Sequence, residues 1–130
     1  YNETEEFFFQ LEGDIVVKIM EDGKPVDIHI NEGEIFLLPA KVPHSPQRAA
    51  NTVGLVMEVQ RRNGMKDGFH WYCEKCNNLL FEEYFLLEDI TTQFPAVMKK
   101  FYDNLEHRTC KKCGTIMEPP AAITGTTKGN

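Results

Sequence analysis

The sequence has no excess of basic residues, no long apolar run and no recognisable signal peptide. Its 14 lysines and arginines stand against 20 aspartates and glutamates, which gives a formal net charge of -6 at pH 7. An acidic chain lacks the positive surface that binds a phosphate backbone, so we expect no nucleic-acid partner. No apolar stretch approaches the roughly 18 residues that a membrane-spanning helix needs, so we also expect no membrane span.

The chain begins with Tyr1 rather than methionine, and a strand-like segment follows almost at once. We therefore expect a fragment or a processed form, with functional residues upstream. Hydrophobic residues make up 42% of the 130 residues, which is enough for one domain with a real core. Nothing in the sequence indicates an oxidising compartment, and we expect a cytoplasmic protein.

Short strands separated by turns are predicted over residues 1–62. The segments alternate or are β-branched, and turn residues such as Asp22 and Gly23 separate them. This spacing is typical of a small β-barrel or sandwich. The expected strands lie at 7–11, 15–20, 26–30, 35–38 and 53–59.

Residues 63–118 are expected to pack on the same domain, but their sequence pattern differs from that of residues 1–62. We predict a strand at 79–87 and a helix that is capped by Thr91 or Thr92 and runs to about Asn104, with Pro95 in its first turn. The remaining residues, 119–130, are rich in proline, glycine and threonine, and we expect a flexible tail.

Four cysteines form two pairs with the same C-x-x-C spacing. Two such pairs can close a tetrahedron of sulfur around zinc or iron, leaving no open position. Gly114 and Asn77, just after the pairs, suit the left-handed backbone that such a turn needs. The alternatives are free or disulfide-linked cysteines, or a redox pair. The four residues are Cys73, Cys76, Cys110 and Cys113.

Acidic residues enter the first apolar strand, and one histidine is braced by prolines. Glu5 and Glu6 alternate faces, so one of them is expected to point inward, where a carboxylate needs a cation or a metal. His44 is expected in a loop closed by Pro43 and Pro46, which restrict its backbone. Taken singly, Glu5 and Glu6 are better explained as a solvated strand end, and His44 as a satisfied core or loop histidine.

The spacing of glycine and proline links Glu6 to His44. Gly13 follows Glu6 after six residues; Pro39 follows Gly33 after five, and His44 lies five further on. These segments resemble the two halves of the cupin motif. In cupins, a histidine and a glutamate from the first half and a histidine from the second point into a small β-barrel.

Two departures from the general motif are informative: Lys41 stands where cupins usually have glycine, and Arg48 where they usually have asparagine. With the paired cysteines, the segments EEFFFQLEGD and GEIFLLPAKVPHSPQR closely resemble the 3-hydroxyanthranilate 3,4-dioxygenase family, in the bacterial and fungal type that keeps the cysteines. The resemblance covers about residues 1–118. It implies a mainly β cupin fold with a C-terminal helix and a four-cysteine metal site.

The resemblance also implies roles for individual residues. Glu6 and His44 match ligands of a catalytic Fe(II), and Arg48 matches the arginine that holds the substrate carboxylate. Glu58 matches the glutamate that hydrogen-bonds the hydroxyl and amino side of the ring. The paired cysteines match a second, rubredoxin-like site for iron or zinc.

The implied reaction is extradiol-type opening of the ring of 3-hydroxyanthranilate with O2. Its product, 2-amino-3-carboxymuconate semialdehyde, closes to quinolinate in the kynurenine route to NAD. The resemblance further implies a homodimer. Two other functions stay open at this point: a non-catalytic cupin that binds a small carboxylate, and a zinc-ribbon interaction module.

The family's first histidine ligand and a second substrate-binding arginine would both fall before Tyr1, so we expect an N-terminal truncation. His29 is no substitute, because its alternating strand directs it to the surface. Arg61 and Arg62 are interpreted as ordinary surface charge. If Glu58 faces the barrel interior, the side of the strand that carries Leu55 must pack against the helix or a partner subunit.

Overall fold

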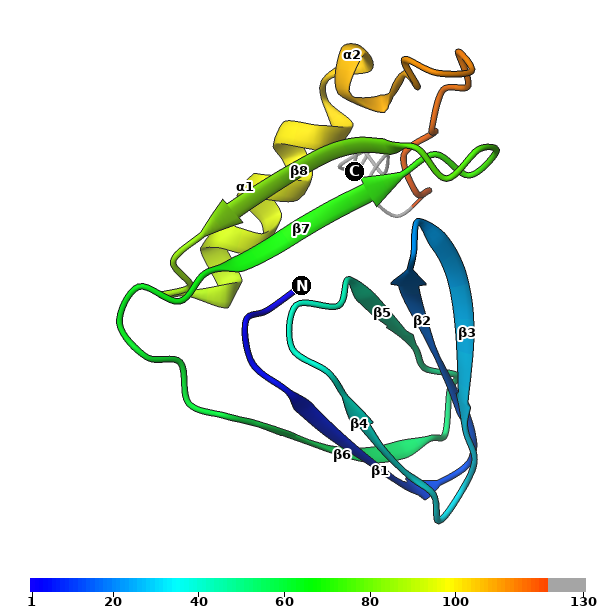
Figure 1. Ribbon diagram of the computed structural model, residues 1–130, viewed down its shortest axis with the longest axis vertical. Helices are drawn as coiled ribbons and strands as arrows, with labels where there is room; N and C mark the ends of the chain where they lie inside the picture. Colours follow the sequence, from blue (N-terminus) through cyan, green and yellow to red (C-terminus); the bar gives the residue numbers. More distant parts are fainter. Residues whose placement is uncertain (122–130) are drawn as a thin grey trace, which may run out of the picture. The chain divides into compact units, whose positions relative to one another are not determined.

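The computed structural model describes residues 1–121, and its N-terminal strands assemble into two three-stranded antiparallel sheets (Figure 1). The first sheet has the order β4-β1-β6, and the second has the order β3-β2-β5. β2 pairs with β3, its neighbour in the chain, while β1 pairs with β4 and β6 and β2 with β5, which lie further along the chain. Such pairing is typical of a small β-barrel. The bounds are β1 Glu6–Glu12, β2 Ile15–Glu21, β3 Lys24–Ile30, β4 Ile35–Leu38, β5 His44–Gln47 and β6 Val53–Glu58.

Alternation of apolar and polar residues decides which face of each sheet is buried. In β1, Glu6, Phe8 and Gln10 are buried, and in β2 Ile15, Val17 and Ile19 are buried. The two inner faces supply one common core, so the sheets pack face to face. The buried apolar members of this core are Phe8, Ile15, Val17, Ile19, Ile30 and Leu38.

The outer face of the β4-β1-β6 sheet is apolar and exposed within residues 1–121. Ile35 and Leu37 of β4 are 64% and 55% exposed, and Leu55 and Met57 of β6 are 46% and 51% exposed. Because β6 turns Glu58 to the same side as Glu6, this row of apolar side chains must face outward. We call Ile35, Leu37, Leu55 and Met57 the outer apolar face.

The expectation that His44 lies in a loop was wrong. His44 begins strand β5, which pairs with β2 so that His44 faces Ile19 and Pro46 faces Val17. The prolines suggested a loop, but a short strand at a sheet edge tolerates proline because its outer backbone groups need no partner. The histidine is therefore fixed by sheet register.

Two further strands and two helices follow. The third sheet is the pair β7 (Asp67–Tyr72) and β8 (Leu79–Phe85), and the helices are α1 (Ile90–Tyr102) and α2 (Leu105–Arg108). Neither β7 nor α2 was predicted. The helix begins earlier than expected, since Asp89 is the N-cap and accepts a hydrogen bond from Thr91 N at 2.9 Å. Pro95 consequently lies beyond the first turn of α1.

The chain divides into two compact units, each described here by itself. Unit 1 comprises Tyr1–His70 with Glu83–Leu87, and unit 2 comprises Trp71–Glu82 with the chain from Glu88 onward. The core of unit 2 is aromatic: Phe101 of α1 is fully buried and stacks on Trp71 with ring centroids 4.3 Å apart. Residues 122–130 of the tail expected at 119–130 lie outside the described residues.

Candidate metal and substrate site

Of the two acidic residues that enter β1, Glu6 points inward. Glu6 is only 6% exposed, while Glu5 is exposed. This confirms the expectation that one of the two carboxylates is buried. Its amide partner is Asn2, itself buried, whose Nδ2 donates to Glu6 Oε1. The carbonyl of Asn2 accepts from Lys41 N at 2.9 Å, which ties this segment to the loop before His44.

The imidazole of His44 is held in one orientation. Its Nδ1 lies 2.9 Å from the carbonyl oxygen of Val42. A ring nitrogen bonded to a carbonyl carries a proton, so Nε2 is the nitrogen left to face Glu6. It can donate to the carboxylate when the ring is protonated and can bind a metal ion when the ring is neutral. This backbone contact is the usual support of a metal-bound histidine.

Glu6 and His44 meet between the two sheets. Oε1 of Glu6 lies 3.3 Å from Nε2 of His44, and both side chains are about nine-tenths buried. Two ligands on adjacent positions of one metal, each at about 2.1 Å, are themselves separated by about 3 Å. The pair therefore fits a metal ion, and a carboxylate with imidazole is a donor set for non-haem iron.

The charge of Glu6 is favoured by its neighbours. Burial alone would raise the pKa of this carboxyl, but the His44 ring and the Asn2 amide outweigh it, so the pKa is lowered. Glu6 is consequently ionised at neutral pH and available as a ligand.

Arg48 reaches the inner face at Gly54. A Cβ built on Gly54 would lie 2.6 Å from Nη1 of Arg48 and 2.6 Å from Oε1 of Gln10. Only glycine therefore leaves room for the guanidinium over β6. Gln10 is almost fully buried opposite Gly54 in the register of β1 and β6.

Glu58 stands beside Glu6 on the same face. The register of β1 and β6 places Glu6 opposite Glu58 and Phe8 opposite Val56. Residues opposite one another in an antiparallel pair have their Cβ atoms about 4.5–5.5 Å apart. All four residues assigned to the first site from the sequence lie in unit 1. Glu6 and His44 have buried side chains, whereas Arg48 and Glu58 are exposed.

The interpretation of Arg61 as ordinary surface charge was wrong. Its guanidinium forms two hydrogen bonds of 2.7 Å with the carboxylate of Asp67, and its Nη2 lies 3.3 Å from Oε2 of Glu58. Sequence reasoning missed this arginine and its partner because they meet only through the turn before β7. Arg62 is exposed, as expected.

Lys41 has φ of +65°, a left-handed conformation at the position where cupins usually have glycine. The backbone requirement is therefore kept although the residue differs. His29 is exposed on β3, as predicted, and takes no part in the site.

The four cysteines lie together in unit 2, as predicted. Cys73 and Cys113 have their sulfur atoms 3.5 Å apart, and Cys76 and Cys110 3.6 Å apart. All four sulfurs lie within 4.8 Å of one another and none is in a disulfide. Tetrahedral zinc or iron with bonds of about 2.3 Å sets sulfur atoms about 3.8 Å apart, so the cluster fits one such ion.

The two pairs have the same backbone hydrogen bonds. Cys73 N donates to Asn78 O and Asn77 N donates to Cys73 O, at 2.8 and 2.9 Å. In the second pair, Cys110 N donates to Thr115 O and Gly114 N donates to Cys110 O, both at 2.8 Å. Asn77 and Gly114 have φ of +60° and +76°, which confirms the left-handed backbone expected there.

The sulfur atoms differ in acidity because they cannot all be charged without a cation. Hydrogen bonds from Thr115 lower the pKa of Cys113 to about 6. The Asn78 backbone favours a Cys76 thiolate, but desolvation and the three other sulfurs raise the pKa of Cys76 to about 12. A bound dication removes this conflict and lets all four ionise.

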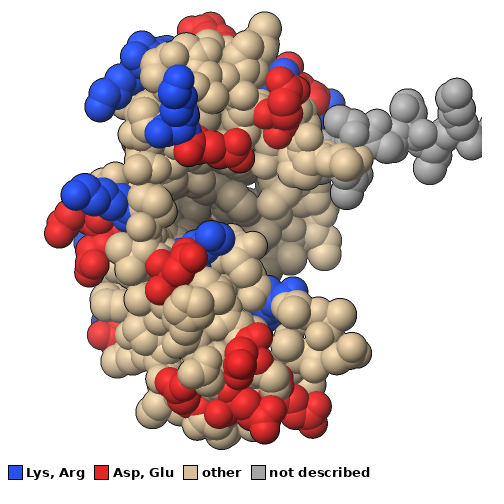
Figure 2. Space-filling model, turned by 90° about the vertical axis from the view of Figure 1, so that its right-hand side faces the viewer, with Lys and Arg blue, Asp and Glu red and all other residues tan. Residues whose placement is uncertain are grey.

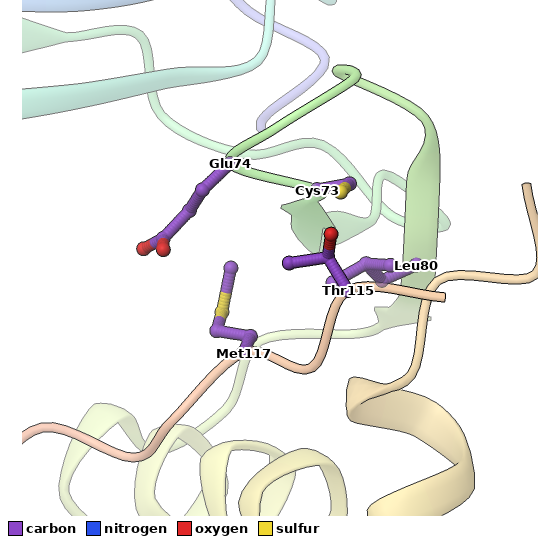
Figure 3. A pocket seen from close by; sticks show the side chains of 5 residues that line it. All are labelled: Cys73, Glu74, Leu80, Thr115 and Met117. Carbon is purple, nitrogen blue, oxygen red and sulfur yellow. The ribbon is translucent and has the colours of Figure 1, made fainter. Parts of the chain in front are cut away.

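A small recess adjoins the cysteine site (Figure 3), with Glu74 and Met117 on one side and Thr115 and Leu80 on the other. Its volume is about 150 Å³, including solvent at its mouth. Pockets for small-molecule ligands span roughly 300–1,000 Å³, so this recess is too small for an aromatic substrate.

Acidic residues outnumber basic residues in this chain, 20 against 14. On the face shown in Figure 2, acidic side chains gather at the lower end, where the β1–β2 and β3–β4 turns of unit 1 lie in Figure 1. Glu12, Asp14, Glu32 and Glu34 are the exposed acidic residues of those turns. Within residues 1–121, neither helix combines the length and the apolar character needed to cross a membrane.

A cupin-like fold that brings a carboxylate and an imidazole together on its inner face is typical of metal-dependent oxygenases. A family model described as 3-hydroxyanthranilic acid dioxygenase matches residues 1–102. This chain belongs to that family and is an enzyme of the dioxygenase class.

Curated relatives agree with the family model. The 3-hydroxyanthranilate 3,4-dioxygenase of Xanthomonas campestris pv. campestris is 53% identical over 120 residues, covering 92% of this chain and 68% of the relative. The enzyme of the same name from Yarrowia lipolytica is 50% identical over 117 residues, covering 88% of this chain and 68% of the relative. That of Candida albicans is 46% identical over 115 residues, covering 88% and 67%.

Proposed function

We propose that this protein opens the ring of 3-hydroxyanthranilate with O2. The bond between ring carbons 3 and 4 breaks and both atoms of O2 enter the product, 2-amino-3-carboxymuconate semialdehyde, so no external reductant is needed. The relatives' name supports the substrate. The product closes to quinolinate, which places the reaction in the kynurenine route to NAD.

The contact between Glu6 and His44 is the observation that carries the proposal. These side chains would hold Fe(II), the ion for which a carboxylate and imidazole set with open positions is typical. When bound, Fe(II) supplies the electronic coupling that lets O2 react with the aromatic ring. The resemblance assigns a further histidine ligand to a position before Tyr1.

Arg48 and Glu58 would orient the substrate. The planar guanidinium of Arg48 matches a carboxylate in two hydrogen bonds, which fixes the ring in its plane. Glu58, beside Glu6 on the inner face, would accept the proton from the ring hydroxyl as the substrate binds. Both groups then act on the substrate from β6 and the chain just before it.

The four cysteines would hold a second ion, iron or zinc, that stabilises unit 2. Four thiolates fill every position of a tetrahedral ion, so this ion takes no part in the reaction. Free cysteines this close together also agree with a reducing compartment, and we propose a cytoplasmic location.

A homodimer is supported by the outer apolar face. Homodimer interfaces are more apolar than the rest of a protein surface, and no charged side chain in β4 interrupts Ile35 and Leu37. A second copy of the chain would cover them. Sedimentation of Leu55→Asp should give a monomer, and an unchanged sedimentation coefficient would place the dimer contact elsewhere.

The experiment that tests the function is oxygen uptake with 3-hydroxyanthranilate and added Fe(II), using protein expressed from its complete coding sequence. We expect stoichiometric O2 consumption and the absorbance of the ring-opened product. Binding of the substrate without consumption of O2 would instead indicate a non-catalytic cupin.

A further inference from the structure

Arg61 is held more rigidly than an arginine on a protein surface usually is. Its Nε and Nη2 donate to the two carboxylate oxygens of Asp67, each at 2.7 Å. A two-point fork of this kind fixes both the position and the plane of the guanidinium. The Arg61 side chain is 32% exposed, so about two thirds of it is removed from solvent.

Asp67 is itself anchored. It is 7% exposed and begins β7, and the next residue, Gly68, donates its N–H to the carbonyl of Tyr1 at 2.9 Å. The amino terminus of Tyr1 donates back to the carbonyl of Gly68 at 3.1 Å. The segment carrying Asp67 is therefore bonded to the segment that leads into Glu6.

The same guanidinium reaches the inner face. Nη2 of Arg61, already bonded to Asp67, also lies 3.3 Å from Oε2 of Glu58. Glu58 stands opposite Glu6 in the strand register, so two carboxylates lie side by side at the metal site. A fixed positive charge next to one of them offsets their repulsion.

The acidity of Arg61 agrees with this arrangement. The hydrogen bonds to Asp67, followed by attraction to Asp67, Glu58 and Glu6, outweigh desolvation and raise its pKa. The positive charge of Arg61 is therefore attracted to both Glu58 and Glu6, although of these two it contacts only Glu58.

We propose that Arg61 and Asp67 form a positioning pair that fixes the carboxylate of Glu58 for proton transfer from the substrate. Arg61 binds Oε2, which leaves Oε1 for the ring hydroxyl. Asp67 keeps Arg61 in place and does not touch the substrate. The inference rests on the proposed role of Glu58 in the ring-opening reaction.

The first test compares Arg61→Met with Arg62→Met in iron-loaded protein. Loss of a charge-assisted hydrogen bond to the proton-accepting group costs about 10–100-fold in rate. We expect Arg61→Met to lower kcat by that factor while KM and iron content stay close to wild type. Arg62→Met, an exposed neighbour, should leave all three unchanged, and Asp67→Asn should lower kcat in the same direction.

A double-mutant cycle separates positioning from a general structural role. If Arg61 acts through Glu58, then Arg61→Met has no further effect in a Glu58→Gln background. Equal losses in both backgrounds would overturn the proposal. So would a fall in melting temperature and iron content that accounts for the lost turnover.

A crystal structure of Arg61→Met gives a readout that needs no turnover. We expect the carboxylate of Glu58 to leave its wild-type position while Glu6 and His44 stay in contact. An unmoved Glu58 would contradict the proposal even in an active enzyme. If the wild-type protein consumes no O2, the proposed function is refuted. The crystal structure would still decide whether Arg61 positions Glu58.

Discussion

Nε2 of His44 lies 3.3 Å from Oε1 of Glu6, although the two side chains come from different sheets. Each sheet supplies one donor, and the shared apolar core sets the distance between them. The geometry of the site therefore depends on packing as much as on the two residues.

We expect Glu6→Gln and His44→Ala to lower the iron content of the purified protein. Either change removes a donor, and even loss of an outer-shell partner lowers metal affinity about 10–100-fold. Metal analysis after dialysis measures the effect. Glu5→Gln is the matched control, because Glu5 is the exposed neighbour and should retain iron. Full iron content in both site variants would show that the pair is only a buried hydrogen bond.

Glu6 should also make the metal-free protein sensitive to acid. Its folded pKa lies below its ordinary value of 4.5, so the carboxylate stabilises the fold above that value. This contribution is lost as the pH falls through the lowered pKa. Urea denaturation of wild type and Glu6→Gln at about pH 6 and about pH 3 should show a smaller loss for the variant. Parallel losses would mean that other carboxylates dominate.

Gly54→Ala should weaken substrate binding without loss of iron. The added methyl would lie 2.6 Å from Nη1 of Arg48, so the guanidinium must move. Loss of a charge-assisted hydrogen bond costs about 1.5–3 kcal/mol, so KM should rise at least about tenfold. Arg48→Ala should do the same. Val53→Ala, an exposed neighbour, should be neutral, and a normal KM in Gly54→Ala would place the substrate away from Arg48.

Cys110→Ser should destabilise the protein more than it affects turnover. The ion at the cysteine site contributes folding free energy, and each lost kcal/mol lowers the melting temperature of a small unit by about 4–8 °C. We expect one fewer metal ion per chain and unchanged kcat per catalytic iron. Lys111→Ser controls for the neighbouring position. A proportional fall in kcat per catalytic iron in folded protein would give the cysteine site a direct part in the reaction.

Local pattern was enough to predict most of the strands and the cysteine cluster. The strand Ile35–Leu38 has the predicted bounds because its apolar run ends at a proline. The cysteines of each pair are brought together by a short turn, which their spacing shows directly. Alternation predicted that one of Glu5 and Glu6 is buried, and the family resemblance pointed to Glu6. These features depend on residues within a few positions of one another.

The remaining features depend on partners far apart in the chain. His44 was assigned to a loop, since nothing local shows that β2 pairs with it. Arg61 was assigned to the surface because Asp67 and Glu58 approach it only in the folded chain. The helix start was misplaced because Asp89 and the two threonines compete as caps, and the sequence alone does not rank them.

Pro46 has one more effect, which concerns association between molecules. β5 lies at the edge of its sheet, where open backbone groups can template a foreign strand. With only four residues and a proline that lacks an N–H, β5 offers an incomplete ladder to any incoming chain. The strand that carries His44 is thereby protected from edge-to-edge aggregation.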